Sequence, residues 1–177
     1  MYKDCGILKK EIKRIEPFVW LKEKKFFSPG RKGFLILTTD SIAIVTSSSS
    51  ENLKEEKVDG AWKDLGKDIA RGMGVDTEHE ISHLIGKYTY EDFEQDMKND
   101  LNFEIKFDSI IRLEVGDYHF LANKLLVVYQ DGKKERKYDF IKIKRIEERS
   151  PLDITVIGTM YDWENVKNMF LSLKDKK

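Results

Sequence analysis

Several residues and patterns that mark particular protein classes are scarce or missing in this 177-residue chain. Its one cysteine, Cys5, excludes an internal disulfide and fits a reducing compartment. No apolar run approaches the roughly 18 residues that a membrane-spanning helix needs. The charged N-terminal stretch lacks the apolar centre of a signal peptide. We therefore expect a cytoplasmic protein.

The chain also has no net charge. The chain has 32 Lys and Arg against 32 Asp and Glu, so nothing in its overall charge favours a nucleic-acid partner. Charged residues still make up 36% of the chain, well above the usual proportion, and Lys and Glu dominate them, as in many thermophile proteins. A hydrophobic content of 40% is enough to build the core of one domain.

Most reaction motifs are absent from the sequence. It contains no phosphate-binding loop, no G-x-G-x-x-G and no G-x-S-x-G, and we predict no cofactor. One motif is present, because His79-Glu80-Ile81-Ser82-His83 matches the H-E-x-x-H pattern of zinc metalloproteases. On a helix, two imidazoles four residues apart can approach one metal ion.

The rest of a zinc-protease site is poorly represented. Thr89 stands where the extended motif has its third histidine, and the remaining histidine, His119, falls in a predicted strand or loop. Thr77 and Glu80 have the spacing of a helix capping box, which accounts for the glutamate without a metal. We therefore predict a non-catalytic protein with no metal ligand. A zinc-dependent hydrolase that uses His79, Glu80 and His83 is the alternative.

The first half of the chain predicts helix, then hairpin, then helices. Apolar residues at helical spacing favour an N-terminal helix over 7–16, which Pro17 would end or bend. Two β-prone runs within 33–46 flank a set of turn-forming residues and predict a hairpin. Apolar residues that recur every three or four positions predict a helical segment over about 51–102.

The second half returns to strand patterns. Residues 103–107 alternate apolar and charged side chains, and 124–143 predicts a second hairpin with Asp131 and Gly132 at its tip. A short strand over 154–158 precedes a final helix over 162–173, with Asp162 as its N-cap. Trp163 and Phe170 are expected to lie buried where this helix meets the sheet, beside residues such as Leu35, Leu37 and Val127.

This order of elements resembles the pleckstrin-homology (PH) superfold, and within it the GRAM-like and bacterial PH-like domains. The resemblance covers 33–46 and 103–173. It is carried by Gly33, Leu35, Leu37, Thr38 and Ile42 of the opening hairpin, by Phe107, Ile110, Leu113 and Glu114, and by the closing helix with its early Trp.

The resemblance implies an α+β fold, in which a bent antiparallel β-sheet or barrel is capped by the C-terminal helix. Residues 51–102 would then be a helical insertion into a single domain that spans 1–177. Because PH-like domains generally bind lipids or protein segments without catalysis, it also implies a binding module.

Basic residues at the tip of the second hairpin are the candidate ligand-binding site: Lys133, Lys134, Arg136 and Lys137. They would meet an anionic membrane surface or an unidentified protein partner. Against a membrane, the stretch from 76 to 104 carries nine acidic residues and two basic ones, which the same surface would repel. Self-association through the helical insertion, as in an assembly protein, is a further alternative.

The zinc question yields a direct prediction. His79→Ala and His83→Ala should leave the free energy of unfolding nearly unchanged, because on a helix both side chains lie opposite the apolar stripe of 81–88. Chemical denaturation and metal analysis of protein purified without a histidine tag would measure this. Stoichiometric zinc that survives gel filtration and disappears in both variants would contradict it.

Overall fold

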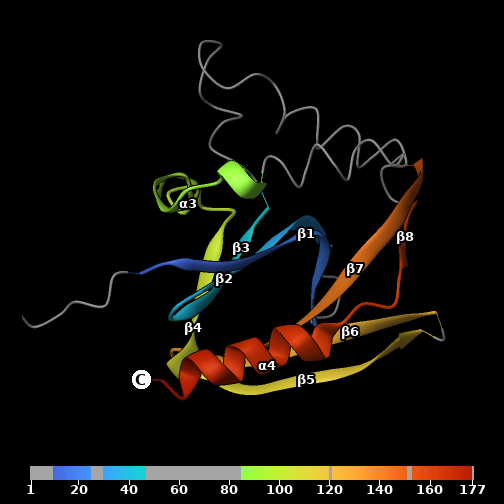
Figure 1. Ribbon diagram of the computed structural model, residues 1–177. Helices are drawn as coiled ribbons and strands as arrows, with labels where there is room; N and C mark the ends of the chain where they lie inside the picture. Colours follow the sequence, from blue (N-terminus) through green and yellow to red (C-terminus); the bar gives the residue numbers. More distant parts are fainter. Residues whose placement is uncertain (1–9, 25–29, 47–84, 120, 151–152, 177) are drawn as a thin grey trace, which may run out of the picture.

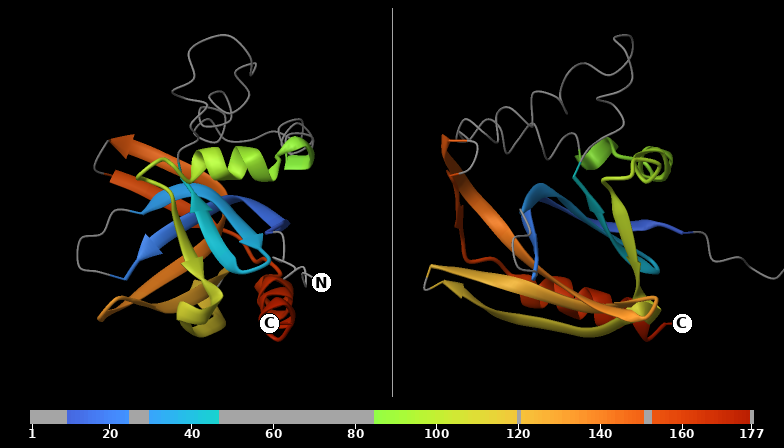
Figure 2. Two further views of the ribbon diagram at one scale, coloured as in Figure 1. Left: turned by 90° about the vertical axis from the view of Figure 1, so that its left-hand side faces the viewer. Right: turned by 180° about the vertical axis from the view of Figure 1, so that it is seen from behind.

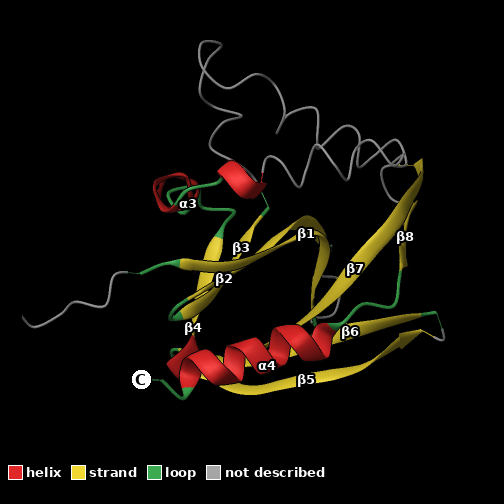
Figure 3. Ribbon diagram, viewed as in Figure 1, coloured by secondary structure: helices red, strands yellow, loops and turns green. Residues whose placement is uncertain are grey.

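A computed structural model describes residues 10–24, 30–46, 85–119, 121–150 and 153–176. These residues form an α+β structure, an antiparallel sheet with a C-terminal helix (Figures 1 and 3). None of the helices in this part of the chain is long and apolar enough to cross a membrane.

The sheet has eight strands among the described residues, in the order β4-β3-β2-β1-β7-β6-β5, with β8 paired to β7. Their bounds are β1 Ile12–Glu23, β2 Arg31–Thr38, β3 Ser41–Val45, β4 Phe103–Lys106, β5 Ile110–His119, β6 Ala122–Asp131, β7 Lys134–Ser150 and β8 Asp153–Gly158. The sheet is strongly bent but does not close, since β4 and β5 are its two edges. The short 3-10 helix η2 (Phe107–Ser109) joins these two edge strands.

Strand β1 links the two halves of the sheet. It pairs with β2 from Ile12 to Leu21 and with β7 from Val19 to Glu23. A β-bulge interrupts its register between Glu16 and Val19, and Phe18 there has a φ of 56°, in the left-handed region. Bulges bend a strand and increase its twist, so the sheet turns at this point.

The prediction of a helix over 7–16 is wrong for the described part of that range, because Ile12 to Glu16 belong to β1. A second register shift between Ile12 and Arg14 explains the error. The extra residue brings Ile12 and Ile15, three apart, onto the same outer cluster of apolar side chains. A bulged strand can therefore imitate the three-residue spacing of a helix.

Both expected hairpins are confirmed, as β2–β3 and β6–β7. Gly33 opens the first hairpin, where a Cβ atom would lie 2.5 Å from the carbonyl oxygen of Val45, so the close approach of β3 requires glycine. The turn of the second hairpin falls at Gly132 and Lys133, one residue later than expected, and Gly132 has a φ of 59°.

Helix α4 (Trp163–Lys174) packs on the concave face of the sheet. The side chain of Asp162 accepts a hydrogen bond from the backbone N–H of Asn165, which confirms the expected N-cap. Trp163 and Phe170 are buried in one cluster with Leu35, Leu37 and Val127, also as expected. The main core therefore lies between α4 and the inward side chains of both halves of the sheet.

The opposite face of the first hairpin is covered by α3 (Tyr90–Asp96). Phe93 is buried there against Ile36, Ala43 and Val45. Thr89 and Asp92 form a capping box at the start of this helix. Figure 2 shows α3 and α4 on opposite sides of the layer that contains β1 to β4. The end of the predicted 51–102 insertion is thus packed on the sheet.

These two helices generate a stability prediction. Phe170→Ala and Phe93→Ala should each lower the free energy of unfolding by about 3–5 kcal/mol, the usual effect of emptying a buried Phe site. Leu171→Ala, on the exposed side of α4, is the control and should lower it by less than about 1 kcal/mol.

Urea denaturation measures all three variants. Deletion of 51–102 would remove Phe93 and expose Ile36, Ala43 and Val45, so we expect it to destabilise at least as much as Phe93→Ala. A fully stable deletion variant would contradict the role given to α3.

Candidate functional site

A pocket of about 390 Å³ lies at the end of the core away from α4. Its lining residues are Leu21, Glu23, Arg31, Asp100, Leu101, Phe103, Glu104, Tyr129, Asp131, Arg136 and Tyr138. Phe103 begins β4 and lines the pocket, whereas Phe107, just after β4, packs edge-on against Phe170 of α4. One end of the core is therefore closed by α4, and the other holds the pocket.

The β6–β7 hairpin builds one wall of the pocket. Its register places Val127 opposite Tyr138, Tyr129 opposite Arg136 and Asp131 opposite Lys134. Side chains of directly paired residues lie on the same face of a sheet. Tyr129, Asp131, Arg136 and Tyr138 therefore converge, although they lie on two strands.

Charge in the pocket is mixed, with acidic groups in excess. Carboxylates of Glu23, Asp100, Glu104 and Asp131 outnumber the guanidinium groups of Arg31 and Arg136 two to one. The Glu104 side chain bonds Lys10 and Ser41, so its charge is shared with a second polar cluster. Aromatic surface comes from Phe103, Tyr129 and Tyr138.

Arg136 is held between two acids. Its Nε lies 2.7 Å from Asp131 Oδ2, and its Nη1 lies 3.5 Å from Glu23 Oε1. A hydrogen bond to the Tyr138 side chain raises the pKa of Arg136, and desolvation raises the pKa of the Tyr129 hydroxyl. The Tyr129 hydroxyl is therefore neutral and the arginine is cationic at any ordinary pH.

The four basic residues predicted as a ligand site do not share one face. Lys133 is in the turn and Lys134 is exposed beside it. Arg136 lines the pocket, whereas Lys137, one residue on, lies 3.0 Å from Glu135. Because successive strand residues face opposite sides, they cannot form a single cationic surface. Binding by this set remains a prediction.

Sequence reasoning missed the pocket acids Glu23, Asp100 and Asp131. A signal for part of the site was present, since a two-residue turn after Asp131 fixes which side chains of 129–136 share a face. Nothing in the local pattern connects that hairpin with Glu23 or Asp100, which reach the pocket through the tertiary fold.

The H-E-x-x-H residues His79, Glu80 and His83 lie outside the described residues. His119 is exposed at the end of β5. Among the residues that the structure describes, no group of three or more His, Cys, Asp or Glu could hold a metal ion. The zinc alternative therefore stays an untested prediction from sequence.

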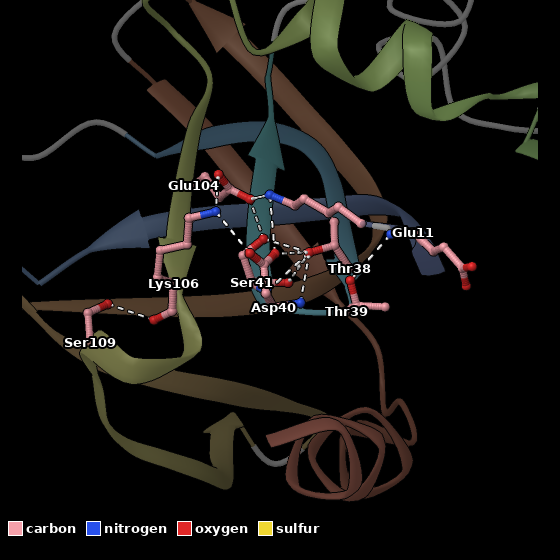
Figure 4. Close-up of polar contacts among 9 residues, drawn as sticks. Glu11, Thr38, Thr39, Asp40, Ser41, Glu104, Lys106 and Ser109 are labelled. Carbon is pink, nitrogen blue, oxygen red and sulfur yellow. Dashed lines mark hydrogen bonds and ion pairs between the residues drawn. The ribbon is translucent and has the colours of Figure 1, made fainter. Parts of the chain in front are cut away.

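A second polar cluster ties the β2–β3 turn to β4 (Figure 4). Lys106 Nζ lies 3.2 Å from Asp40 Oδ2 and 3.1 Å from Glu104 Oε2. Lys10 contacts the same two carboxylates, at 3.2 Å from Asp40 Oδ1. The buried Thr38 hydroxyl donates to Asp40 Oδ1, and Ser41 donates to Glu104. Two acids and two lysines thus neutralise one another, and the cluster fixes strands.

The third polar cluster holds α4 to the bend of β1. Glu16 is only 4% exposed and accepts hydrogen bonds from Arg14 and from the Tyr161 hydroxyl. Lys142 Nζ lies 3.6 Å from Glu16 Oε2 and donates to the carbonyl oxygen of Pro17 at 2.7 Å. The carboxylate is satisfied within the protein, so this cluster is structural.

Comparison of the chain with protein-family models, with curated proteins and with solved structures gave no match.

The Asp40 cluster predicts an acid-dependent loss of stability. Partial desolvation raises the pKa of Asp40, but hydrogen bonds from Lys106 and Lys10 lower it more, to about 2 from an ordinary value of 3.8. Because the folded-state pKa is depressed, the stabilisation is complete above about pH 4 and is lost as pH falls through 2.

Urea denaturation between about pH 5 and pH 2 should show a steeper loss of unfolding free energy for the unmodified protein than for Asp40→Asn. The variant keeps the backbone carbonyl of residue 40, which accepts from Phe107 N–H. Identical pH profiles would show that the ion pairs of Asp40 do not form in solution.

Proposed function

We propose that this protein is a non-catalytic binding module of the PH-like class, and that it recruits a partner polypeptide through the pocket between β1, β4 and the β6–β7 hairpin. The observation that carries the proposal is the asymmetry of the core. Helix α4 covers one end of the bent sheet, and a pocket of about 390 Å³ occupies the other. That volume lies within the range of roughly 300–1,000 Å³ typical of ligand sites.

The fold supports the PH-like assignment. Two halves of a bent antiparallel sheet share β1, and an amphipathic C-terminal helix with Trp163 at its start packs on the concave face. This is the arrangement that the sequence resemblance implies. The cytoplasmic location is part of the same proposal, on the ground of the single cysteine.

The pocket lining favours binding over catalysis. Its eleven residues include no Ser, Thr, Cys, His or Lys. Three of its four carboxylates are engaged in ion pairs, Glu23 and Asp131 with Arg136 and Glu104 with Lys10 and Lys106, which leaves them poorly placed to act as nucleophile or base. One of the two arginines in the lining, Arg136, is already paired with Asp131 and Glu23. Aromatic and leucine side chains supply apolar contact area, as in sites that hold peptide side chains.

The pocket also favours a polypeptide over an anionic membrane. A lipid phosphate would have to compete with two carboxylates for Arg136 and would face the further charge of Asp100. Lys133 and Lys134 at the hairpin tip attract such a surface but do not line the pocket. Membrane recruitment through these lysines is the outcome against which the proposal is tested.

Selection of peptides from a random phage-displayed library tests the proposal. Selected peptides should bind the unmodified protein and Leu121→Asn equally, and should bind Leu101→Asn at least tenfold more weakly. Leu101, at the pocket, is 51% exposed, and Leu121, at the far end of β6, is 67% exposed. Neither change buries a charge, so both variants should fold.

The opposing result is co-sedimentation with phosphatidylserine vesicles that is lost in Lys133→Glu/Lys134→Glu, together with no peptide whose binding depends on Leu101. That result would make the protein a membrane-recruitment module. Arg136 is left unchanged in this test, because its ion pairs belong to the pocket.

A further inference from the structure

The charges and side chains of the pocket indicate which chemical group it binds. This inference about the ligand rests on the proposed function. Glu104 is neutralised by Lys10 and Lys106. The three other carboxylates of the lining still outnumber the two guanidinium groups of Arg31 and Arg136, so the local potential is negative, although the chain as a whole is neutral. A concave site with one sign of charge in excess concentrates ligands of the opposite sign. The ligand group is therefore expected to be a cation.

The contacts of Arg136 indicate which kind of cation the side chains of the pocket can bind. Asp131 lies 2.7 Å from its Nε, and Glu23 lies 3.5 Å from its Nη1. The pocket is thus lined by groups that already hold one guanidinium, supplied by the protein itself. A carboxylate can accept up to about four hydrogen bonds, so Asp131 can bridge Arg136 and a second guanidinium.

Aromatic rings continue the wall beside these acids. The ring centroids of Phe103 and Tyr138 are 5.3 Å apart, and those of Tyr129 and Tyr138 are 6.0 Å apart and nearly parallel. The tyrosines are buried and Phe103 is partly exposed. A guanidinium stacks on aromatic faces as well as pairing with carboxylates, and a compact, strongly hydrated ammonium does so less well.

The rim supplies a second point of contact. Asp100 is exposed at the pocket and makes no ion pair with another described residue, and Leu101 beside it is half-exposed. Asp100 can meet the incoming charge, and Leu101 can cover the aliphatic part of a long side chain. A volume of about 390 Å³ suits one extended side chain rather than a folded surface.

We infer that this pocket binds an arginine side chain presented by a partner polypeptide. Asp131 and Asp100 pair with its guanidinium, Phe103 stacks on it, and Leu101 packs on the stem. Lysine is a weaker ligand at the same place, and an anionic group is excluded by the carboxylates.

Backbone amide NMR titration with acetyl-Gly-Arg-Gly-amide tests this inference. The matched control peptide carries citrulline, which has nearly the shape of arginine but no charge. The arginine peptide should give saturable shifts at 100–104 and 129–138, and the citrulline peptide should bind at least fivefold more weakly. Raising the salt concentration from about 0.05 M to about 0.5 M should weaken binding of the arginine peptide and leave binding of the citrulline peptide unchanged.

Two variants locate the effect. Asp100→Asn should weaken binding of the arginine peptide by about two- to fivefold, as expected for one exposed charge pair. The control is Asp117→Asn, since Asp117 is also exposed and lies on β5 opposite Asn123, outside the pocket lining; this change should leave binding unchanged. Equal weakening in both variants would reveal a general charge effect and would overturn the inference.

Other outcomes separate the inference from the proposed function. Equal binding of the arginine and citrulline peptides overturns the inference. So does preferential binding of inositol hexakisphosphate at Arg31 and Arg136. If the phage-selected peptides depend on Leu101 but contain no arginine, the recruitment function stands and the arginine inference fails. If no peptide depends on Leu101, both fail.

Discussion

The bend of β1 is the constraint on which the rest of the structure depends. Before the bulge between Glu16 and Val19, β1 pairs with β2 alone. After the bulge, it pairs with β7 as well. Phe18 takes a left-handed backbone conformation there, which a non-glycine residue keeps only when its surroundings hold it. Burial of its ring beside Ile143 and the satisfied carboxylate of Glu16 supply that support.

The same bend separates the two ends of the core. Trp163 and Phe170 fill the end that faces α4, and the contact of Tyr161 with Glu16 ties the start of that helix to the bulge. At the other end, Phe103 of β4 packs against Tyr138 of β7, and both rings line the pocket. Neither of the described helices α3 and α4 contributes a residue to this lining.

How much of this could be predicted from sequence depended on the range of the interactions. The β2–β3 and β6–β7 hairpins, strand β8 and α4 with its Asp162 cap were predictable, since each depends on alternation, turn residues or capping within a short stretch. The helix expected over 7–16 failed because bulges in β1 reproduce a three-residue spacing. Within the predicted basic site, Arg136 and Lys137 face opposite sides because strand residues alternate, a separation that the local run of basic residues does not reveal; whether the set binds a ligand stays a prediction.

The sequence by itself determined the α+β class, the two hairpins and the burial of Trp163 and Phe170, because the spacing of apolar residues indicates which face of a helix or strand is buried. Only the tertiary structure decided that α3 covers the outer face of the first hairpin and that Glu23, Asp100 and Asp131 meet around Arg136. Those residues come from three distant segments, and polar side chains carry no periodic signal that pairs one segment with another. Their convergence follows from the bend of β1, a long-range consequence of how the sheet is assembled.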